Sequence, residues 1–159
     1  MANYTQLNTA QNAGDQWTAD IKNQMTDNDE YLRNPPQGTY ALSTGAANIT
    51  TASATMVDLT GFTVTVTIQA NPGGDVKVSM KLMGRANGTT ARFDFLVDGV
   101  SVTGDNDALG APGATGFVTI ERIIAVTAGS HTFKVQWRST SGTVTWYAAG
   151  LGQLTVRQI

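Results

Sequence analysis

The chain has 159 residues, a formal charge of −2 at pH 7 and no cysteine. This length suits one main domain with an appendage, and a domain of this size buries about 68–70% of its unfolded surface without needing covalent cross-links. The lack of cysteine excludes a disulfide framework and thiolate metal sites. The small net charge argues against the basic field that nucleic-acid binding requires.

The charge is unevenly distributed along the chain. Residues 1–38 hold five acidic and two basic side chains, for a net charge of −3, whereas residues 39–159 hold seven acidic and eight basic side chains, for a net charge of +1. The first residues are neither basic nor apolar, and no apolar run reaches membrane-spanning length. We therefore expect no signal peptide and no membrane insertion.

A short helix is predicted near the beginning of the chain, over residues 16–33. Residues 1–14 are small and polar and predict an arm that becomes ordered against a partner. Asp15 can cap the helix, and Pro35 and Pro36 prevent its continuation. One narrow stripe of mostly apolar positions follows the helical period, with Tyr31 beside it: Trp17, Ile21, Met25, Asn28 and Leu32.

This helix has two ways of being stabilised. About 18 residues are marginal for an isolated helix in water, so the stripe must be covered either by the chain's own β domain or by sister chains. An asparagine within an apolar stripe is typical of coiled coils in which it fixes register and oligomeric state. We therefore favour association, with three helices burying Trp17, Ile21 and Met25 on an axis where Asn28 side chains bond.

After Gln37 the period changes from that of a helix to that of a strand. Apolar and polar residues alternate over 62–68, 76–82 and 132–138, and glycine-rich turns such as Asp98-Gly99 separate such runs. Ten strands are predicted, near 39–43, 52–59, 62–70, 75–84, 90–97, 100–103, 116–127, 131–139, 143–149 and 152–158. Strands this numerous, with no helices between them, predict an antiparallel β-sandwich over residues 38–159.

No arrangement of residues points to catalysis. The single histidine, His131, lies at a predicted hairpin tip, and no nucleophile elbow surrounds any serine. We expect His131 to begin a strand and to form local hydrogen bonds. Asp94 and Asp98 would lie about 13 Å apart along a strand, beyond the spacing of about 5–9.5 Å of glycosidase carboxylates. A pairing of these acids with Glu121 is the remaining route to an enzyme, and we predict no catalytic residue and no cofactor.

A weak ligand-binding signal comes from one long loop and one aromatic side chain. The loop over 104–116 contains Asp105 and Asp107, which resemble the start of a calcium loop. The later positions of that loop pattern are not filled, so no metal site is predicted. Trp137 and Trp146 alternate with core residues, which leaves Tyr147 facing outward. The candidate ligand-binding residues are Tyr147, Asp105, Asp107 and His131.

The chain resembles virion proteins of phages and prophages. The resemblance rests on Trp17-Thr-Ala-Asp-Ile-Lys-Asn, Asn28, Tyr31-Leu32 and Asn34-Pro-Pro, and on the later phrases Val97-Asp-Gly-Val100 and Ala128-Gly-Ser-His-Thr-Phe-Lys-Val-Gln-Trp137. It is similar to appended fibre or minor tail-type proteins that begin with an arm and a tryptophan-containing helix. This resemblance implies a C-terminal jelly roll of the tumour-necrosis-factor/C1q type, usually trimeric, and implies no cofactor.

Together these features predict an all-β, antiparallel jelly-roll sandwich preceded by a short N-terminal α-helix. Residues 1–37 would attach and trimerise, through Trp17, Ile21, Met25, Asn28, Tyr31 and Leu32, and residues 38–159 would face outward. The expected function is that of a non-enzymatic bacteriophage structural protein of the virion, assembled in the host bacterial cytoplasm and bound to capsid or tail proteins as a tail fibre, minor tail or head decoration protein. The alternative is a carbohydrate-binding module that recognises a host-surface glycan.

Overall fold

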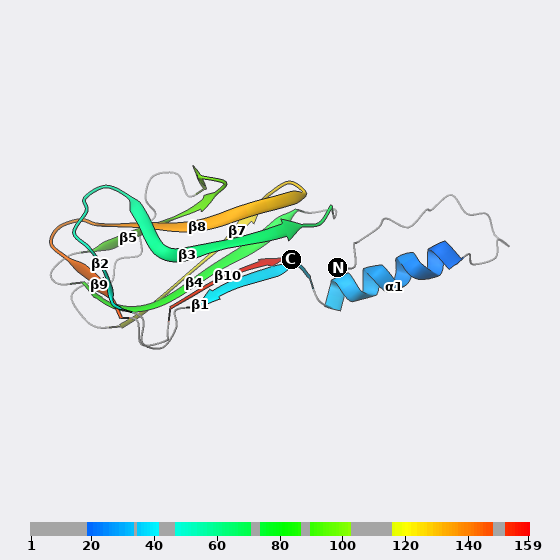
Figure 1. The fold of residues 1–159 in the computed structure, drawn as a ribbon, viewed down its shortest axis with the longest axis horizontal. Coiled ribbons are helices and arrows are strands. Elements are labelled where there is room, and N and C mark those ends of the chain that lie inside the picture. Colours follow the sequence, from blue (N-terminus) through cyan, green and yellow to red (C-terminus); the bar gives the residue numbers. More distant parts are fainter. Residues whose placement is uncertain are drawn as a thin grey trace.

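In the computed structural model, one helix and ten strands form within the described residues (Figure 1), which are 19–33, 35–41, 47–70, 74–86, 90–102, 116–147 and 152–159. The side chains of residues 19, 20, 40, 85 and 86 are outside this description. The elements are α1 (Ala19–Arg33), β1 (Gln37–Ala41), β2 (Ile49–Thr51), β3 (Val57–Ile68), β4 (Asp75–Ala86), β5 (Ala91–Val97), β6 (Val100–Ser101), β7 (Gly116–Ala125), β8 (Gly129–Ser139), β9 (Val144–Trp146) and β10 (Gln153–Gln158).

The strands form two antiparallel sheets with the connectivity of a jelly roll. The first sheet has six strands in the order β1-β10-β4-β9-β2, with β7 on the free side of β4, and the second has four in the order β3-β8-β5-β6. Setting aside the short β2 and β9, the strands form two four-stranded sheets, β1-β10-β4-β7 and β3-β8-β5-β6, and the chain crosses between them at every step except from β5 to β6. This is the eight-stranded, double Greek-key arrangement that defines the jelly roll, and the predicted fold class is confirmed.

The core lies between the sheets and is supplied by alternate residues of each strand. In β3 the inward residues Phe62, Val64, Val66 and Ile68 are buried, while the threonines between them are exposed. Trp137 and Trp146 are both almost fully buried, with ring centroids 6.0 Å apart, and Phe93 lies 5.3 Å from the Trp146 ring. Because Trp146 belongs to the six-stranded sheet and Trp137 to the other, this aromatic group joins the two sheets, and the predicted core position of both tryptophans is confirmed.

The predicted strand over 52–59 is wrong. Residues 52–56 are not a strand: β2 ends at Thr51 and β3 begins at Val57. The Ser53 hydroxyl donates to the Thr55 carbonyl at 2.7 Å, and the Thr51 hydroxyl accepts from the Ser53 amide at 3.1 Å. Such short-range bonds from serine and threonine replace ladder bonds and turn the chain between the two sheets.

β3 is also longer than predicted, because it continues through an irregularity. The pairing of β3 with β8 shifts register between Asp58 and Thr63, and Gly61 between them has φ of 83°. A glycine tolerates this left-handed backbone, so the strand bulges and continues rather than ending. The predicted Asp98-Gly99 turn is confirmed: both residues have positive φ, at 51° and 84°, which defines the type I′ hairpin between β5 and β6.

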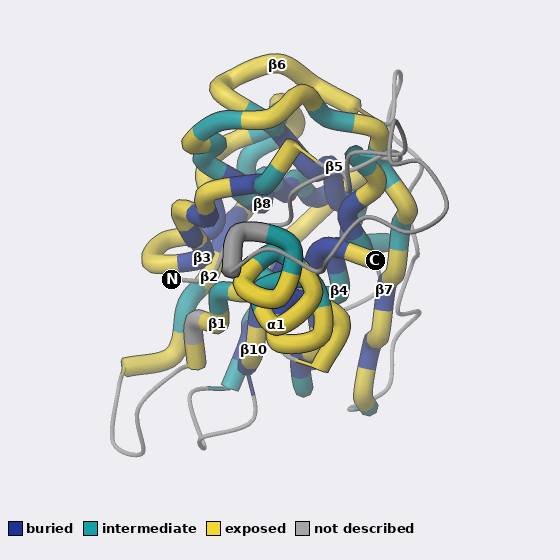
Figure 2. The backbone as a smooth tube through the Cα atoms, turned by 90° about the vertical axis from the view of Figure 1, so that its right-hand side faces the viewer, coloured by how far each residue is buried: buried dark blue, intermediate teal, exposed yellow. Residues whose placement is uncertain are grey.

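Helix α1 extends away from the end of the sandwich at which β10 ends (Figure 1). Viewed along the sandwich, the helix is mostly exposed, whereas buried positions gather between the sheets behind it (Figure 2). The last residues of β3, β5 and β7 and the first residues of β4 and β8 lie toward this same end, and the last residues of β8 and the first residues of β9 lie at the opposite end. The sandwich therefore has a helix end and a far end.

Two glycines that face each other across β4 and β7 predict opposite effects of substitution. A Cβ atom on Gly84 would overlap the Trp146 ring and lie 2.7 Å from the Thr145 carbonyl oxygen, whereas a Cβ atom on Gly116, its register partner, would meet nothing within 4 Å. We expect Gly84→Ala to lower the free energy of unfolding by about 1–3 kcal/mol through overpacking. Gly116→Ala is the matched control and is expected to change it by less than about 0.5 kcal/mol. Urea unfolding followed by tryptophan fluorescence measures both, and equal losses would contradict this packing.

Candidate functional site

The exposed apolar side chains of α1 are the first feature of the candidate site. Met25 is 44% exposed and Leu32 is 72% exposed, while Ile21 and Asn28 are half-buried. These four residues keep the spacing of four, three and four that places them on one side of a helix. Trp17, the remaining residue of the predicted stripe, lies outside the described residues, as do residues 16–18 of the predicted helix.

The rest of the helix surface is polar and acidic. Asp29 and Arg33 form an exposed ion pair of 2.9 Å one turn apart, and the Thr26 hydroxyl donates to the Lys22 carbonyl at 3.0 Å. An exposed pair of this kind contributes only about 0.3–0.5 kcal/mol to a helix. These local bonds do not replace the cover that Met25 and Leu32 lack.

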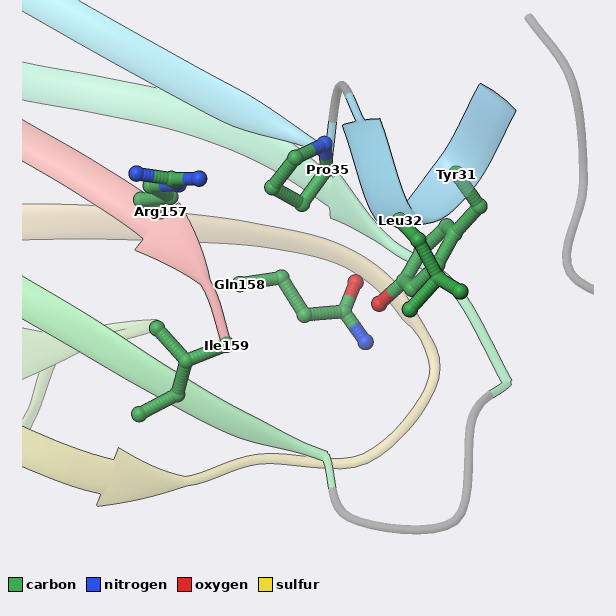
Figure 3. A pocket seen from close by; sticks show the side chains of 6 residues that line it. All are labelled: Tyr31, Leu32, Pro35, Arg157, Gln158 and Ile159. Atoms are coloured by element: carbon green, nitrogen blue, oxygen red, sulfur yellow. The ribbon is translucent and has the colours of Figure 1, made fainter. Parts of the chain in front are cut away.

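The base of the helix packs on the end of the sandwich through Tyr31. This side chain is 5% exposed and is the only buried one among those described in α1. It lines a pocket of about 340 Å³ whose other walls come from the last turn of the helix and the end of β10 (Figure 3): Leu32, Pro35, Arg157, Gln158 and Ile159. Of the six predicted attachment residues, Tyr31 therefore contacts the chain's own sandwich.

Gln158 holds this junction together. Its side chain is fully buried, its Oε1 accepts from the Gln69 backbone N–H at 3.0 Å, and its Nε2 donates to the Gln69 carbonyl at 3.1 Å. The side-chain amide of Gln158 thus bonds both the N–H and the C=O of the Gln69 backbone, as a residue of a neighbouring strand would. It links β10 in one sheet to the end of β3 in the other. The backbone N–H of Gln158 donates to the Pro36 carbonyl at 2.9 Å, which ties the segment after the helix to the same point.

His131 belongs to the helix end and has a structural role. Its Nδ1 lies 2.7 Å from Oδ2 of Asp98, and its Nε2 lies 2.9 Å from the Thr127 carbonyl oxygen. Both ring nitrogens therefore lie within hydrogen-bonding distance of oxygen atoms on neighbouring turns, and each such bond requires the proton on that nitrogen. The expected local hydrogen bond of His131 is the one with Thr127, four residues away, whereas Asp98 is 33 residues away in the chain. The strand begins two residues earlier than predicted, so His131 is its third residue and not its first.

Tyr147 lies at the other end of the molecule. Its backbone N–H donates to the Met83 carbonyl at 3.0 Å, and its side chain is half-buried. His131 is near the opposite end of β4, where Val126 bonds Gly74. Eight residues of strand, or about 26 Å, separate Asp75 from Met83. The structure does not bring His131 and Tyr147 together, and Asp105 and Asp107 lie outside the described residues.

The carboxylates considered for catalysis are also separated. Asp94 is buried in β5, opposite Gln136, whereas Glu121 lies in the other sheet and contacts Lys77 at 3.0 Å. Asp98 occupies the hairpin turn and bonds His131. Within the described ranges, no group of three or more histidine, aspartate or glutamate side chains could hold a metal ion, and no helix is long and apolar enough to cross a membrane.

Three exposed carboxyls are stabilised in their charged form. The pKa of Asp98 is lowered by the hydrogen bond that the Thr132 backbone N–H donates, and then by that of His131. The pKa of Asp58 is lowered by hydrogen bonds from Gln136 and then Lys134. The pKa of Glu121 is lowered by a hydrogen bond from Lys77. Each bond is formed with the ionised oxygen and is weakened by protonation.

Two outward residues of β7, Phe117 and Ile123, were not singled out from the sequence. They are 57% and 66% exposed on the outer face of the six-stranded sheet. Lys81 Nζ lies 5.3 Å from the centre of the Phe117 ring. The signal was present in Gly116-Phe-Val-Thr-Ile-Glu-Arg-Ile-Ile-Ala125, where both alternating sets contain large apolar residues. One of those sets must therefore face outward.

No protein-family model matches the chain, and no curated protein matches it. Among solved structures, the fold is similar to VP2 of the infectious bursal disease virus subviral particle, with a TM-score of 0.51 and 11% identity over 77% of this chain and 33% of that one. Two carbohydrate-binding modules are also similar: one from Cellvibrio mixtus lichenase 5A (TM-score 0.38, 15% identity, 79% of this chain and 91% of that one) and one from Paenibacillus barcinonensis (0.37, 19%, 76% and 98%).

The likeness to VP2 shows a shared fold. This chain spans about a third of the length of that protein. At such low identity the likeness concerns the arrangement of strands, and it agrees with the jelly-roll connectivity read from the sheets.

The hairpin carboxylate predicts a defined pH dependence. A lowered pKa in the folded state stabilises the protein above the unfolded pKa of about 3.9, and that stabilisation is lost as the pH falls through the folded value. Asp98→Asn keeps a residue that tolerates positive φ but removes the charge. We expect the variant to be less stable than the wild type at pH 7, and the difference to shrink below about pH 4. Urea unfolding from pH 7 to pH 2 measures this, and a difference independent of pH would contradict the assignment.

Proposed function

We propose that this chain is a non-enzymatic structural protein of a tailed-bacteriophage virion. In this proposal it is a homotrimer, attached to capsid or tail proteins through residues 1–37, with its jelly-roll domains projecting outward. The observation that carries the proposal is the course of α1, which leaves the sandwich with Met25 and Leu32 uncovered (Figure 1). The helix and the proline residues after it resemble those of phage virion proteins, and this resemblance supports the assignment to a phage particle.

The energetics of α1 favour a partner. The helix has 15 described residues and touches the sandwich mainly through Tyr31 at its base. A helix of this length is marginal in water, because nucleation is costly and each turn adds little. Fully burying such a side chain contributes about 1.5–3 kcal/mol, so covering the exposed 72% of Leu32 and 44% of Met25 would contribute about 1–2 and about 0.7–1.3 kcal/mol. Association is therefore the source of stability that the isolated chain lacks.

The shape of the helix base supports association with sister copies. Leu32 and Ile159, which is 56% exposed, lie on the wall of the same pocket beneath the helix. A neighbouring helix that covers Met25 and Leu32 would also cover this apolar base. Since Tyr31 and Gln158 fix the base to the sandwich, the helix would place each jelly roll at a defined angle to the axis.

The composition of the stripe supports a defined number of copies. Asn28 lies between Met25 and Leu32 in the spacing, and a polar residue in such a position specifies register and oligomeric state at some cost in stability. A trimer follows from the resemblance to trimeric jelly-roll proteins. In a trimer the three far ends, with the connection between β8 and β9, would point away from the attachment point. Weak contacts made by three such ends would act together as one avid contact.

The helix predicts the outcome of a mass measurement. We expect the wild type to be a trimer by size-exclusion chromatography with light scattering at micromolar concentration. We expect Met25→Asp/Leu32→Asp to be a monomer, because it places two charges where the trimer would bury apolar side chains. The matched control is Asn23→Asp, at an exposed position of the same helix. Asn28→Ile is expected to associate still, but with a mixture of oligomeric states. A monomeric wild type would refute the trimer.

The second candidate function is recognition of a host-surface carbohydrate at the far end. Tyr147 favours it, because this half-buried aromatic side chain lies among the connections at the end away from the helix. An aromatic face with a polar edge suits a sugar ring. Asp105 and Asp107 stay with Tyr147 as candidates, whereas His131 lies at the helix end and would not contribute to the same surface.

A glycan array tests the second candidate. If Tyr147 stacks on a sugar, Tyr147→Ala should lose at least about 1 kcal/mol of binding, or roughly a fivefold weaker signal, on every glycan that the wild type binds. His131→Ala, at the opposite end, is the matched control and should retain the signal. Equal loss in both variants, or no bound glycan for the intact oligomer, would count against carbohydrate recognition.

A further inference from the structure

Among the described residues, strand β7 has a hydrogen-bonded neighbour on one side only. In the described part of the chain its paired neighbour is β4, with Asp75 opposite Ala125 and Gly84 opposite Gly116. The Val126 N–H continues this register and donates to the Gly74 carbonyl at 2.9 Å. In an antiparallel pair, residues that bond the neighbour alternate with residues that do not. The even-numbered residues of β7 therefore bond β4, and the odd-numbered residues point their N–H and C=O groups to the outer edge.

The same odd-numbered residues present exposed side chains. Phe117 and Ile123 are the two large apolar ones, and Thr119 and Glu121 lie between them. Phe117 and Ile123 are each three residues from Ile120, so the exposed set is symmetric about that residue. A long edge strand with exposed apolar side chains is a template for pairing with another strand.

We propose that β7 pairs antiparallel with β7 of a second copy of this chain, around a two-fold axis at Ile120. In this register Phe117 of each copy lies opposite Ile123 of the other, and Thr119 lies opposite Glu121. Every residue of these pairs directs its N–H and C=O groups to the shared edge. In the single copy the Glu121 carbonyl there accepts a hydrogen bond of 3.1 Å from Nη1 of Arg122, and a carbonyl oxygen can accept a second bond. The four pairs would exchange about eight backbone hydrogen bonds, two for each pair.

Neighbouring registers are less favourable. Shifting the register by two residues in one direction places Glu121 opposite Glu121 of the second copy. Like charges directly opposite each other are destabilising. Moving it in the other direction places Phe117 opposite Glu121. The register centred on Ile120 pairs both large apolar side chains with each other and separates the two carboxylates.

A lysine of β4 adds charge complementarity. Lys81 lies opposite Thr119 in the β4–β7 ladder and is exposed on the same face. In the proposed pair, Glu121 of the second copy lies on the other side of Thr119. The backbones of this lysine and glutamate would be two strand spacings, or about 9.6 Å, apart. Their long side chains can span this distance and bring the charged groups together. Each copy would supply one such pair, so the contact contains two.

This contact is independent of the helix. It is two-fold and isologous, whereas three helices on an axis form a three-fold assembly. A chain with both contacts would connect one helix-bound assembly to the next through the sides of its jelly rolls. The proposed edge contact does not require the helix contact, and the failure of one would leave the other standing.

Cysteine cross-linking tests the register, and the lack of native cysteine makes the result specific. Directly opposite, hydrogen-bonded residues have Cα atoms about 5.5 Å apart, within the range of a disulfide. We expect a mixture of Phe117→Cys and Ile123→Cys chains to form a disulfide-linked dimer under mild oxidation, and each variant alone to form little. The double variant should cross-link with itself. No dimer in the mixture, or equal dimer in the single variants, would overturn the proposed pairing.

A proline tests the edge bonds without changing the core. Thr119 directs its N–H to the outer edge, so Thr119→Pro removes bonds of the proposed contact and none to β4. We expect this variant to keep its circular dichroism spectrum and to lose the cross-link when built into both cysteine chains, while the matched Thr119→Ser retains it. Repeating the measurement with Met25→Asp/Leu32→Asp separates the two contacts, since the edge cross-link should persist. A cross-link that survives Thr119→Pro in a folded protein would overturn the proposal.

Discussion

The sandwich depends on β4, which has hydrogen-bonded neighbours on both sides along nearly its whole length. β7 follows one side of it, and the other side is shared in succession by β10 and β9. Its inward residues Val76, Val78, Met80 and Leu82 are almost completely buried. A register error in this strand would turn that set toward solvent and displace the strands paired with it. The positions of Tyr147, the β7 edge and the end of β10 all follow from this one strand.

The exchange of β10 for β9 occurs where β4 has no side chain. Gly84 allows Trp146 to lie directly against the backbone, and from there the indole reaches Phe93 and Trp137 of the other sheet. Filling this space with a side chain would separate the sheets at their most aromatic point. The close approach of the Trp146 ring to the Gly84 backbone therefore determines how tightly the two sheets pack. It also explains why a glycine is found inside a long strand.

Much of the sandwich could be predicted because its strands carry a strict two-residue period. The runs around Val64, Val78 and Val135 each display their buried face in the sequence, and Asp98-Gly99 displays its turn. The segment around Ser53 could not be read in this way. Its polar and apolar residues alternate over 51–56 as they would in a strand, but its short-range hydroxyl bonds decide against one. Sequence periodicity reports on burial, and it does not report on bonds that compete with a ladder.

The candidate site was less predictable, because it consists of contacts between residues far apart in the chain. Gln158 pairs with Gln69, and His131 pairs with Asp98, at separations that no local pattern encodes. Tyr31 was grouped with the attachment residues of the helix, yet it is buried and lines a pocket with the end of β10. Met25 and Leu32, which the helical period placed on one side of the helix, are both exposed in the structure. The period alone identifies residues that share a face of a helix, and it needs no knowledge of the fold.

The joining of α1 to β1 has a mechanical consequence. β1 begins one residue after Pro36, and it is bonded along its length to β10, with Gln37 opposite Arg157 and Ala41 opposite Gln153. The helix continues roughly along the long axis of the sandwich (Figure 1). A pull on the helix would therefore act along β1, across hydrogen bonds that are perpendicular to the strands. These bonds would share the force instead of opening one after another, so the jelly roll is joined to α1 in shear.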